Sequence, residues 1–147
     1  MLRNIPPILS PALLKALREM GHGDTLVLAD RNFPSESIGR NSIVIRYDGF
    51  GIPELLDAIL TLFPVDTYVP KPISFMQVVP GDPVETPIWE EYTAIIKRRG
   101  EAPEALLDPV EEVERFAFYE KAAAAYLIIA TGETALYGNV ILQKGTL

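Results

Sequence analysis

The sequence contains no cysteine and one histidine among its 147 residues. Without cysteine the chain can form no disulfide framework, no thiolate nucleophile and no cysteine-based metal site. A single histidine also excludes a metal site built from several histidines. Because a cysteine-free chain suits a reducing compartment, we expect the protein to be cytoplasmic.

Positive charge is also scarce, since 13 basic residues face 20 acidic ones and the formal net charge is -7. Such a chain repels phosphate backbones and has no basic stripe, so no nucleic-acid partner is expected. Long apolar runs are absent as well. The longest, residues 122–130, is far shorter than the ~20 residues of a spanning helix, so no membrane association is expected. Prolines interrupt the N-terminal segment "MLRNIPPILSP", so it does not resemble a secretory signal.

What the chain does have is a hydrophobic content of 48%, enough to bury the core of one domain spanning residues 1–147. Helical and β-type patterns alternate along it. The pattern predicts helices at 11–20, 53–63, 87–99 and 115–125, and strands at 25–29, 42–46, 73–79, 126–131 and 139–143. This alternation favours an α/β fold of three layers, with helices on both faces of a sheet. We expect a mixed sheet because the last two strands are close in sequence.

The first helix has signals at both ends. Ser10 and Pro11 suit the N-cap and the first helical position. Gly21 stands where a helix commonly needs a left-handed residue, so we expect the helix to stop there. His22 then lies in the turn before the strand at 25–29.

The motifs of the common enzyme classes are missing. The chain has no GxSxG, no HExxH, no GxxxxGK[ST] and no GxGxxG after a strand. One histidine remains, together with carboxylates, tyrosines and arginines. That set suits general acid/base catalysis.

His22 and Asp30 stand on either side of the first strand. Asp30 follows the carboxyl end, where ligands bind in open α/β sheets, and histidine transfers protons near neutral pH. Both residues also have structural explanations. A histidine just past a helix interacts favourably with the helix dipole, and aspartate commonly opens loops. For the two to act together, the fold has to bring His22 near Asp30.

Two later segments carry further candidates. Arg115 begins a helix, where the dipole disfavours positive charge, so a polyol or anionic ligand or a salt bridge would account for it. Phe116 and Tyr119 share a face of that helix, and core packing explains them most simply. The segment "YGN", 137–139, is typical of a turn in which Gly138 supplies an unusual φ.

Four stretches together carry a resemblance to a known family: "LLKALREMGHGD", "ADRNFP", "RFAFYEKA" and "TGETALYGNVILQKG". They resemble the RbsD/FucU family of sugar mutarotases, and "RFAFYE" with "YGN" is more similar to the fucose branch than to the ribose branch. The resemblance implies a three-layer α/β domain that assembles into rings, often decamers, with pockets close to subunit interfaces. The region from about Pro80 to Val113 departs from the family pattern.

The resemblance also implies an activity, the interconversion of the α and β anomers of a free monosaccharide, without metal or cofactor. By the same resemblance His22 is the proton donor and Tyr119 a second proton-transfer group. The sugar-binding positions implied are Asp30, Arg115, Tyr137, Gly138 and Asn139. Two other interpretations stay open from the sequence: a sugar-binding protein without catalytic activity, and a purely structural ring-forming protein.

Overall fold

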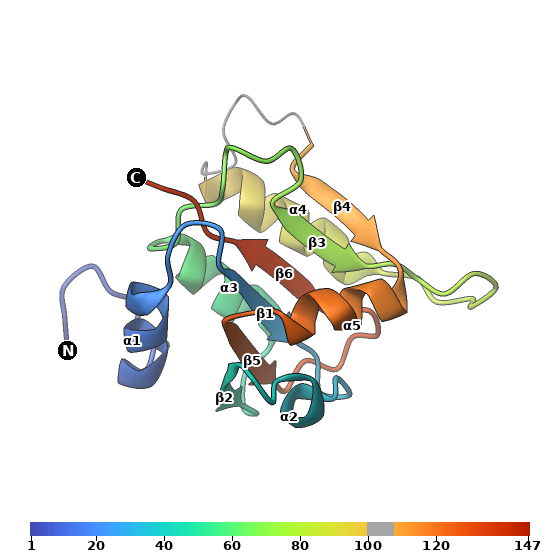
Figure 1. Ribbon diagram of the computed structural model, residues 1–147, viewed down its shortest axis with the longest axis horizontal. Coiled ribbons are helices and arrows are strands. Elements are labelled where there is room, and N and C mark those ends of the chain that lie inside the picture. Colours follow the sequence, from blue (N-terminus) through green and yellow to red (C-terminus); the bar gives the residue numbers. More distant parts are fainter. Residues whose placement is uncertain (100–107) are drawn as a thin grey trace.

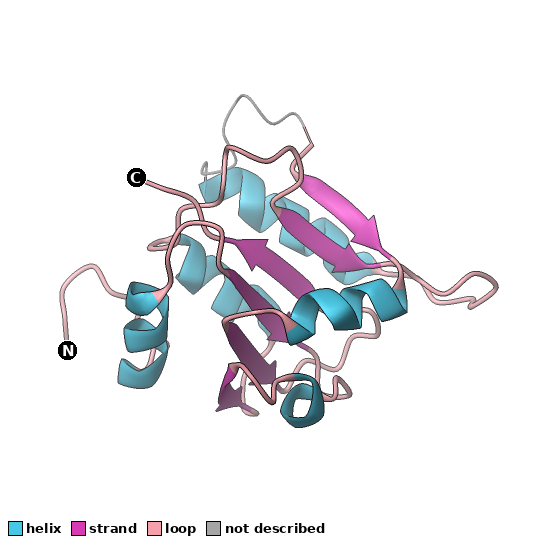
Figure 2. Ribbon diagram, viewed as in Figure 1, coloured by secondary structure: helices cyan, strands magenta, loops and turns pink. Residues whose placement is uncertain are grey.

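The computed structural model describes residues 1–99 and 108–147, which form a six-stranded sheet with helices packed on both of its faces (Figures 1 and 2). The strand order is β2-β5-β1-β6-β3-β4. The strands are β1 (Thr25–Ala29), β2 (Ile43–Tyr47), β3 (Ile73–Met76), β4 (Val110–Val113), β5 (Leu127–Thr131) and β6 (Val140–Gln143). The helices are α1 (Pro11–Glu19), α2 (Ser35–Ile38), α3 (Ile52–Leu60), α4 (Pro87–Arg99) and α5 (Arg115–Ala123).

The sheet is mixed, as expected, but for a different reason. The strands β5 and β6 are close in sequence and do not pair with each other, because β1 lies between them. β6 runs antiparallel to both β1 and β3, and the remaining pairs are parallel. The carboxyl ends of β1 to β5 therefore meet at one end of the sheet, which we call the carboxyl end.

Alternation along β1 shows how the layers are built. Leu26 and Leu28 are fully buried among side chains of α1, α3 and α4 on one face. Val27 and Ala29 point to the opposite face, where they join Phe118 of α5 in a second cluster. Successive strand residues face opposite sides of a sheet, so one five-residue strand contributes to both cores. The predicted three-layer α/β architecture is confirmed.

The first helix ends differently from the prediction. The Ser10 side chain accepts a hydrogen bond from the Leu13 amide at 3.2 Å, which confirms the N-cap. The left-handed residue, however, is Gly23 with φ of +86°, and the prediction for Gly21 was wrong. Met20 leaves the helix in an extended conformation, and the left-handed residue comes two positions later than expected.

Three further details differ from the sequence-based prediction. The short helix α2 lies in the segment expected to be a loop after Asp30, and the edge strand β4 was not predicted. β4 is acidic, and Glu111 forms an ion pair with Lys121 at 2.6 Å. Phe116 is exposed rather than buried, and Phe118 takes the core position on α5. The loop expected at 100–109 lies largely outside the described residues.

Within the described residues, no helix has the length and hydrophobicity that a membrane crossing requires.

Phe118 offers a test of the second core. The ring is fully buried, so Phe118→Ala should lower the free energy of unfolding by about 3–5 kcal/mol. The matched control is Phe50→Ala, because Phe50 is 41% exposed and should cost less than about 1.5 kcal/mol. Urea unfolding monitored by circular dichroism measures both. Equal losses would contradict the assignment of α5 to a packed layer.

Candidate active site

The candidate site is built around a pair of buried polar side chains, Asp30 and Asn139. Asp30 directly follows β1 and Asn139 directly precedes β6, and the antiparallel register pairs Leu28 with Val140. That register brings two residues 109 positions apart in sequence side by side at the carboxyl end. The Asp30 amide donates to Asn139 Oδ1 at 2.8 Å, and Asn139 Nδ2 donates to Asp30 Oδ2 at 2.9 Å.

Burial raises the pKa of the Asp30 carboxyl, although hydrogen bonds from Asn32, Asn139 and Phe33 oppose the shift. The Asn32 amide donates to Asp30 Oδ1 at 2.9 Å, so each carboxylate oxygen already has one donor. A carboxylate oxygen has two lone pairs. Asp30 can therefore still accept hydrogen bonds from hydroxyl groups of a ligand.

The segment Tyr137 to Asn139 forms the turn before β6, as predicted, but its unusual backbone lies elsewhere. Tyr137 has φ of +56°, and Gly138 is not in the left-handed region. Glycine is needed at 138 for space, because a Cβ there would lie 3.0 Å from the Ala135 carbonyl oxygen. The Tyr92 hydroxyl donates to the Gly138 carbonyl at 2.8 Å and fixes the turn from the buried side.

Arg115 and Tyr119 reach the same end of the sheet from α5. The helix begins two residues after β4, and the Glu114 side chain caps it by accepting from the amides of Phe116 and Ala117. Arg115 Nε donates to the Tyr119 hydroxyl oxygen at 3.2 Å. Phe33 packs edge-on against the Tyr119 ring at a centroid distance of 5.5 Å. The Tyr119 oxygen thus accepts from Arg115, and its own hydrogen remains available for a ligand.

These side chains line one cavity of about 190 Å³, here called the Asp30 cavity. Its polar groups are two carboxylates, of which that of Asp30 is buried, two amides, a guanidinium and two phenols, and its apolar surface comes from Phe33, Met76 and Leu136. Adjacent donors and acceptors beside apolar surface suit a polyhydroxylated molecule with a hydrocarbon face. The lining residues are Asp30, Asn32, Phe33, Met76, Asp82, Arg115, Tyr119, Leu136, Tyr137 and Asn139.

His22 does not lie in this cavity. It precedes β1, whereas Asp30 follows it, and five strand residues at about 3.3 Å each separate the two by roughly 16 Å. Within one chain the fold therefore does not bring His22 near Asp30. His22 is instead about half exposed at the opposite end of the sheet, with Nε2 3.2 Å from both carboxylate oxygens of Asp66.

Asp66 is a partner that the sequence analysis missed. Its buried carboxylate accepts hydrogen bonds from the Tyr68 amide at 2.9 Å and the Gln143 side chain at 2.8 Å, besides the contact with His22. Burial opposes ionisation of Asp66, but these hydrogen bonds together outweigh it and lower the pKa. The exposed Tyr68 ring lies 5.4 Å from the imidazole. The signal in the sequence was a lone aspartate after the apolar "FPV", too weak to link it with a residue 44 positions away.

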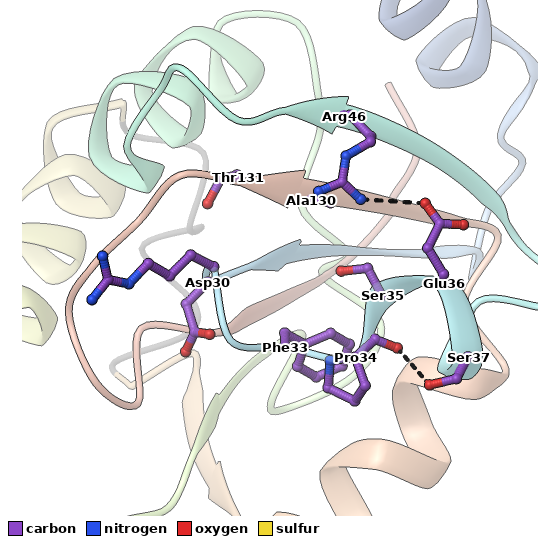
Figure 3. A pocket seen from close by; sticks show the side chains of 10 residues that line it. Asp30, Phe33, Pro34, Ser35, Glu36, Ser37, Arg46, Ala130 and Thr131 are labelled. Carbon is purple, nitrogen blue, oxygen red and sulfur yellow. Dashed lines mark hydrogen bonds and ion pairs between the residues drawn. The ribbon is translucent and has the colours of Figure 1, made fainter.

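A second cavity, of about 290 Å³, lies on the other side of Asp30, between α2 and the ends of β1 and β5 (Figure 3). Its groups are largely bonded to one another: Arg46 contacts Glu36 at 3.3 Å, and the Ser37 hydroxyl donates to the Pro34 carbonyl. The buried Ser35 hydroxyl has no partner among the described residues, but one hydroxyl is too little to hold a sugar. We therefore place the candidate chemistry in the Asp30 cavity.

Over residues 1–99 and 108–147, no group of three histidine, aspartate or glutamate side chains is arranged to hold a metal ion.

The fold and the cavity define an α/β protein with a polar cavity at the carboxyl end of its sheet. A family model described as the RbsD / FucU transport protein family matches residues 3–147, so the chain belongs to this family, as predicted. Fucose mutarotase from Homo sapiens is 51% identical over 150 residues, covering 99% of this chain and 94% of that protein.

Solved structures agree with the sequence comparison. The crystal structure of FucU from Bifidobacterium longum has a TM-score of 0.91 and 57% identity, covering 97% of this chain and 98% of that one. The crystal structure of the fucose mutarotase from Streptococcus pneumoniae in complex with L-fucose also has a TM-score of 0.91, with 49% identity and 99% coverage of both chains.

The buried pair predicts a pH-dependent loss of stability in the variant Asn139→Asp. A second carboxylate beside Asp30 should cost about 3 kcal/mol or more at pH 7. Burial already raises the pKa of the Asp30 carboxyl, and a neighbouring carboxylate raises at least one pKa of the pair further. Stability is therefore lost as the pH rises through that raised pKa and recovers on acidification. Urea midpoints measured from pH 4 to pH 8 should show this trend.

The control is Asn32→Asp, which adds the same charge at an exposed neighbour of Asp30. Its midpoint should change little with pH relative to the unmodified protein. If Asn139→Asp were as stable as this control at pH 7, the two side chains could not be the buried pair described here.

Proposed function

We propose that the protein is a mutarotase that interconverts the α and β anomers of L-fucose or a closely related free monosaccharide. The observation that carries the proposal is the convergence of Asp30, Asn139, Arg115, Tyr119 and Tyr137 on one cavity. It is supported by the fucose mutarotases that share about half of this chain's residues. In this proposal residues 1–147 act as one domain. The protein is placed in the cytoplasm, a reducing compartment that suits a chain without cysteine.

The reaction needs proton transfers at two oxygens of the sugar. An acid protonates the ring oxygen while a base takes the proton of the anomeric hydroxyl, and the bond between the anomeric carbon and the ring oxygen breaks. The resulting aldehyde rotates and closes again on its other face. Because the bonds broken and formed are the same, the reaction consumes no oxidant, metal or cofactor. A positioned acid/base contributes ~10²–10⁴-fold to such a step.

The cavity supplies most of the required groups. Asp30 accepts hydrogen bonds from sugar hydroxyls, Arg115 donates to them, and the Asn139 amide retains one N–H beyond its bond to Asp30. Tyr119 is the proton-transfer group within the cavity, since Arg115 already donates to its oxygen and leaves its hydrogen for the substrate. Gly138 contributes its backbone to the turn that holds Tyr137 and Asn139.

We assign the role of proton donor to His22 of a neighbouring copy of the chain. Asp66 holds the imidazole by its Nε2 atom, and the ring is half exposed at the end of the sheet opposite the cavity. A contact between the amino end of one sheet and the carboxyl end of the next would insert this imidazole into the Asp30 cavity. Such a head-to-tail contact uses two different surfaces and forms a ring where the rotation between successive copies closes.

Exposed apolar side chains fit this arrangement. Val79, Phe116 and Leu136 are exposed around the Asp30 cavity, and Tyr68 and Leu62 are exposed at the end that carries His22. Burying large apolar side chains is the main favourable contribution to association. We therefore expect a homo-oligomeric ring, for which the family resemblance implies a decamer. Light scattering would measure its mass directly.

One observation favours a second candidate, a monosaccharide-binding protein without catalytic activity. His22 is remote from Asp30 within one chain, so an isolated subunit has a sugar cavity but lacks the histidine. Such a receptor would bind sugar normally after His22 is replaced. The two functions are therefore separated by the loss of His22.

The first test is exchange NMR between the α and β anomeric protons of L-fucose, with D-ribose, L-rhamnose and D-galactose alongside. We expect exchange above the buffer rate with the intact protein, and a loss of ~10²–10⁴-fold with His22→Ala because its proton transfer is removed. Binding of the sugar should persist in this variant. If a sugar binds and no sugar exchanges faster than the blank, the protein is a receptor.

Complementation tests where His22 acts. We expect His22→Ala and Arg115→Ala each to be inactive alone. When the two variants are co-expressed in equal amounts, about a quarter of the head-to-tail sites should combine an intact His22 from one copy with an intact Arg115 from the next. Exchange NMR should then recover to roughly a quarter of the normal rate. A mixture as inactive as its components would show that both residues act within one chain.

A further inference from the structure

The loop between β3 and α4 projects from the carboxyl end of the sheet and returns to the start of α4 (Figure 1). It opens with Val79-Pro80-Gly81-Asp82, in which the Asp82 amide donates to the Val79 carbonyl at 3.0 Å and Gly81 has φ of +88°. Proline at the second position and a left-handed glycine at the third are typical of a type II turn. This turn fixes the direction in which Asp82 leaves the loop.

Asp82 meets the phenol of Tyr137 inside the Asp30 cavity. The Tyr137 hydroxyl donates to Asp82 Oδ2 at 2.7 Å, and its oxygen accepts the Val79 amide at 3.3 Å. Both residues line the cavity. The hydrogen of the phenol is thus committed to the carboxylate, and only a lone pair on its oxygen remains for a ligand.

The same segment also holds the backbone of Tyr137. The indole of Trp89 in α4 donates to the Tyr137 carbonyl at 2.9 Å. Tyr137 is a non-glycine residue with φ of +56°, a conformation that costs free energy and persists where its surroundings enforce it. Val79, Asp82 and Trp89 contact Tyr137 from one side of the cavity and hold it in this conformation.

We propose that Asp82 is a positioning residue of the sugar site, which acts through Tyr137 by fixing its phenol as a hydrogen-bond acceptor toward one sugar hydroxyl. The two tyrosines of the cavity then differ in role. Tyr119 accepts from Arg115 and offers its hydrogen, whereas Tyr137 donates to Asp82 and offers its oxygen. A sugar is thereby oriented by one phenolic donor and one phenolic acceptor. This inference rests on the proposed mutarotase function.

The test is a double-mutant cycle on L-fucose exchange, measured by NMR over a range of sugar concentrations. Asp82→Ala should raise KM about fivefold to tenfold and change kcat less than about twofold, because the lost orientation weakens binding rather than proton transfer. Tyr137→Phe should raise KM similarly. The double variant should resemble Tyr137→Phe within about twofold, since Asp82 then has no phenol to act on.

Two further variants sharpen the cycle. Asp82→Asn keeps an oxygen that can accept from Tyr137, so its KM should fall between that of the unmodified protein and that of Asp82→Ala. Glu85→Ala is the matched control, because it removes an exposed carboxylate from the same loop and should leave KM unchanged within about twofold. Emission from Trp89, the only tryptophan, reports on the Tyr137 turn without sugar and should change in Asp82→Ala but not in the control.

The possible outcomes distinguish a failure of the Asp82 proposal from a failure of the proposed mutarotase function. The role of Asp82 would be overturned if KM were unchanged in Asp82→Ala, or if the increases in KM of the two single variants multiplied in the double variant. In either case, exchange by the unmodified protein would still support the mutarotase function. If the unmodified protein accelerates no exchange, the proposed function fails. The role of Asp82 is then tested on the Kd for L-fucose measured from Trp89 emission, and the five variants must show the same pattern in Kd as predicted for KM.

Discussion

The candidate site depends on the reciprocal hydrogen bonds between Asp30 and Asn139. Each side chain is buried, so each would cost free energy without the other, and together they leave a single arrangement for both. The pair joins the end of β1 to the start of β6, where the one antiparallel strand of the described sheet meets its neighbours. Because the turn at Tyr137 to Asn139 is anchored there, the phenol, the amide and the carboxylate share one rigid frame.

Among the described residues two aspartates are buried, and their pKa values are shifted in opposite directions. Burial dominates at Asp30 and raises its pKa, whereas three donors surround Asp66 and lower its pKa. Asp66 is therefore held as an anion beside His22 Nε2, where it fixes the orientation of the imidazole. Asp30 holds its charge less firmly and is suited to accepting hydroxyl donors. One strand of five residues keeps these two environments apart.

Local sequence patterns predicted most helices and strands of the fold, but they predicted only part of the candidate site. Local signals predicted β1 from its β-type composition, α3 from its apolar face and α4 from Pro87 and Gly100 at its ends, because each signal lies within one stretch of chain. β4 was missed because its two central glutamates hide the alternation of an edge strand. Asp66 and Asp82 were missed for a different reason: their partners, His22 and Tyr137, lie 44 and 55 residues away, and only the tertiary fold brings them together. Local sequence predicted that His22 lies in the turn before β1, but its role was inferred from the resemblance alone.

The acidic character of β4 has a consequence for how copies of the chain can meet. An edge strand with free backbone groups is a template for another strand, and charged side chains on it discourage such pairing. Glu112 of β4 is exposed, and Glu111 is engaged by Lys121 and Ser74. Each sheet therefore stays a separate hydrogen-bonded unit. In the ring proposed above, contacts between copies would fall to side chains at the two ends of the sheet, where a substitution would alter the affinity between copies without disturbing the backbone of either.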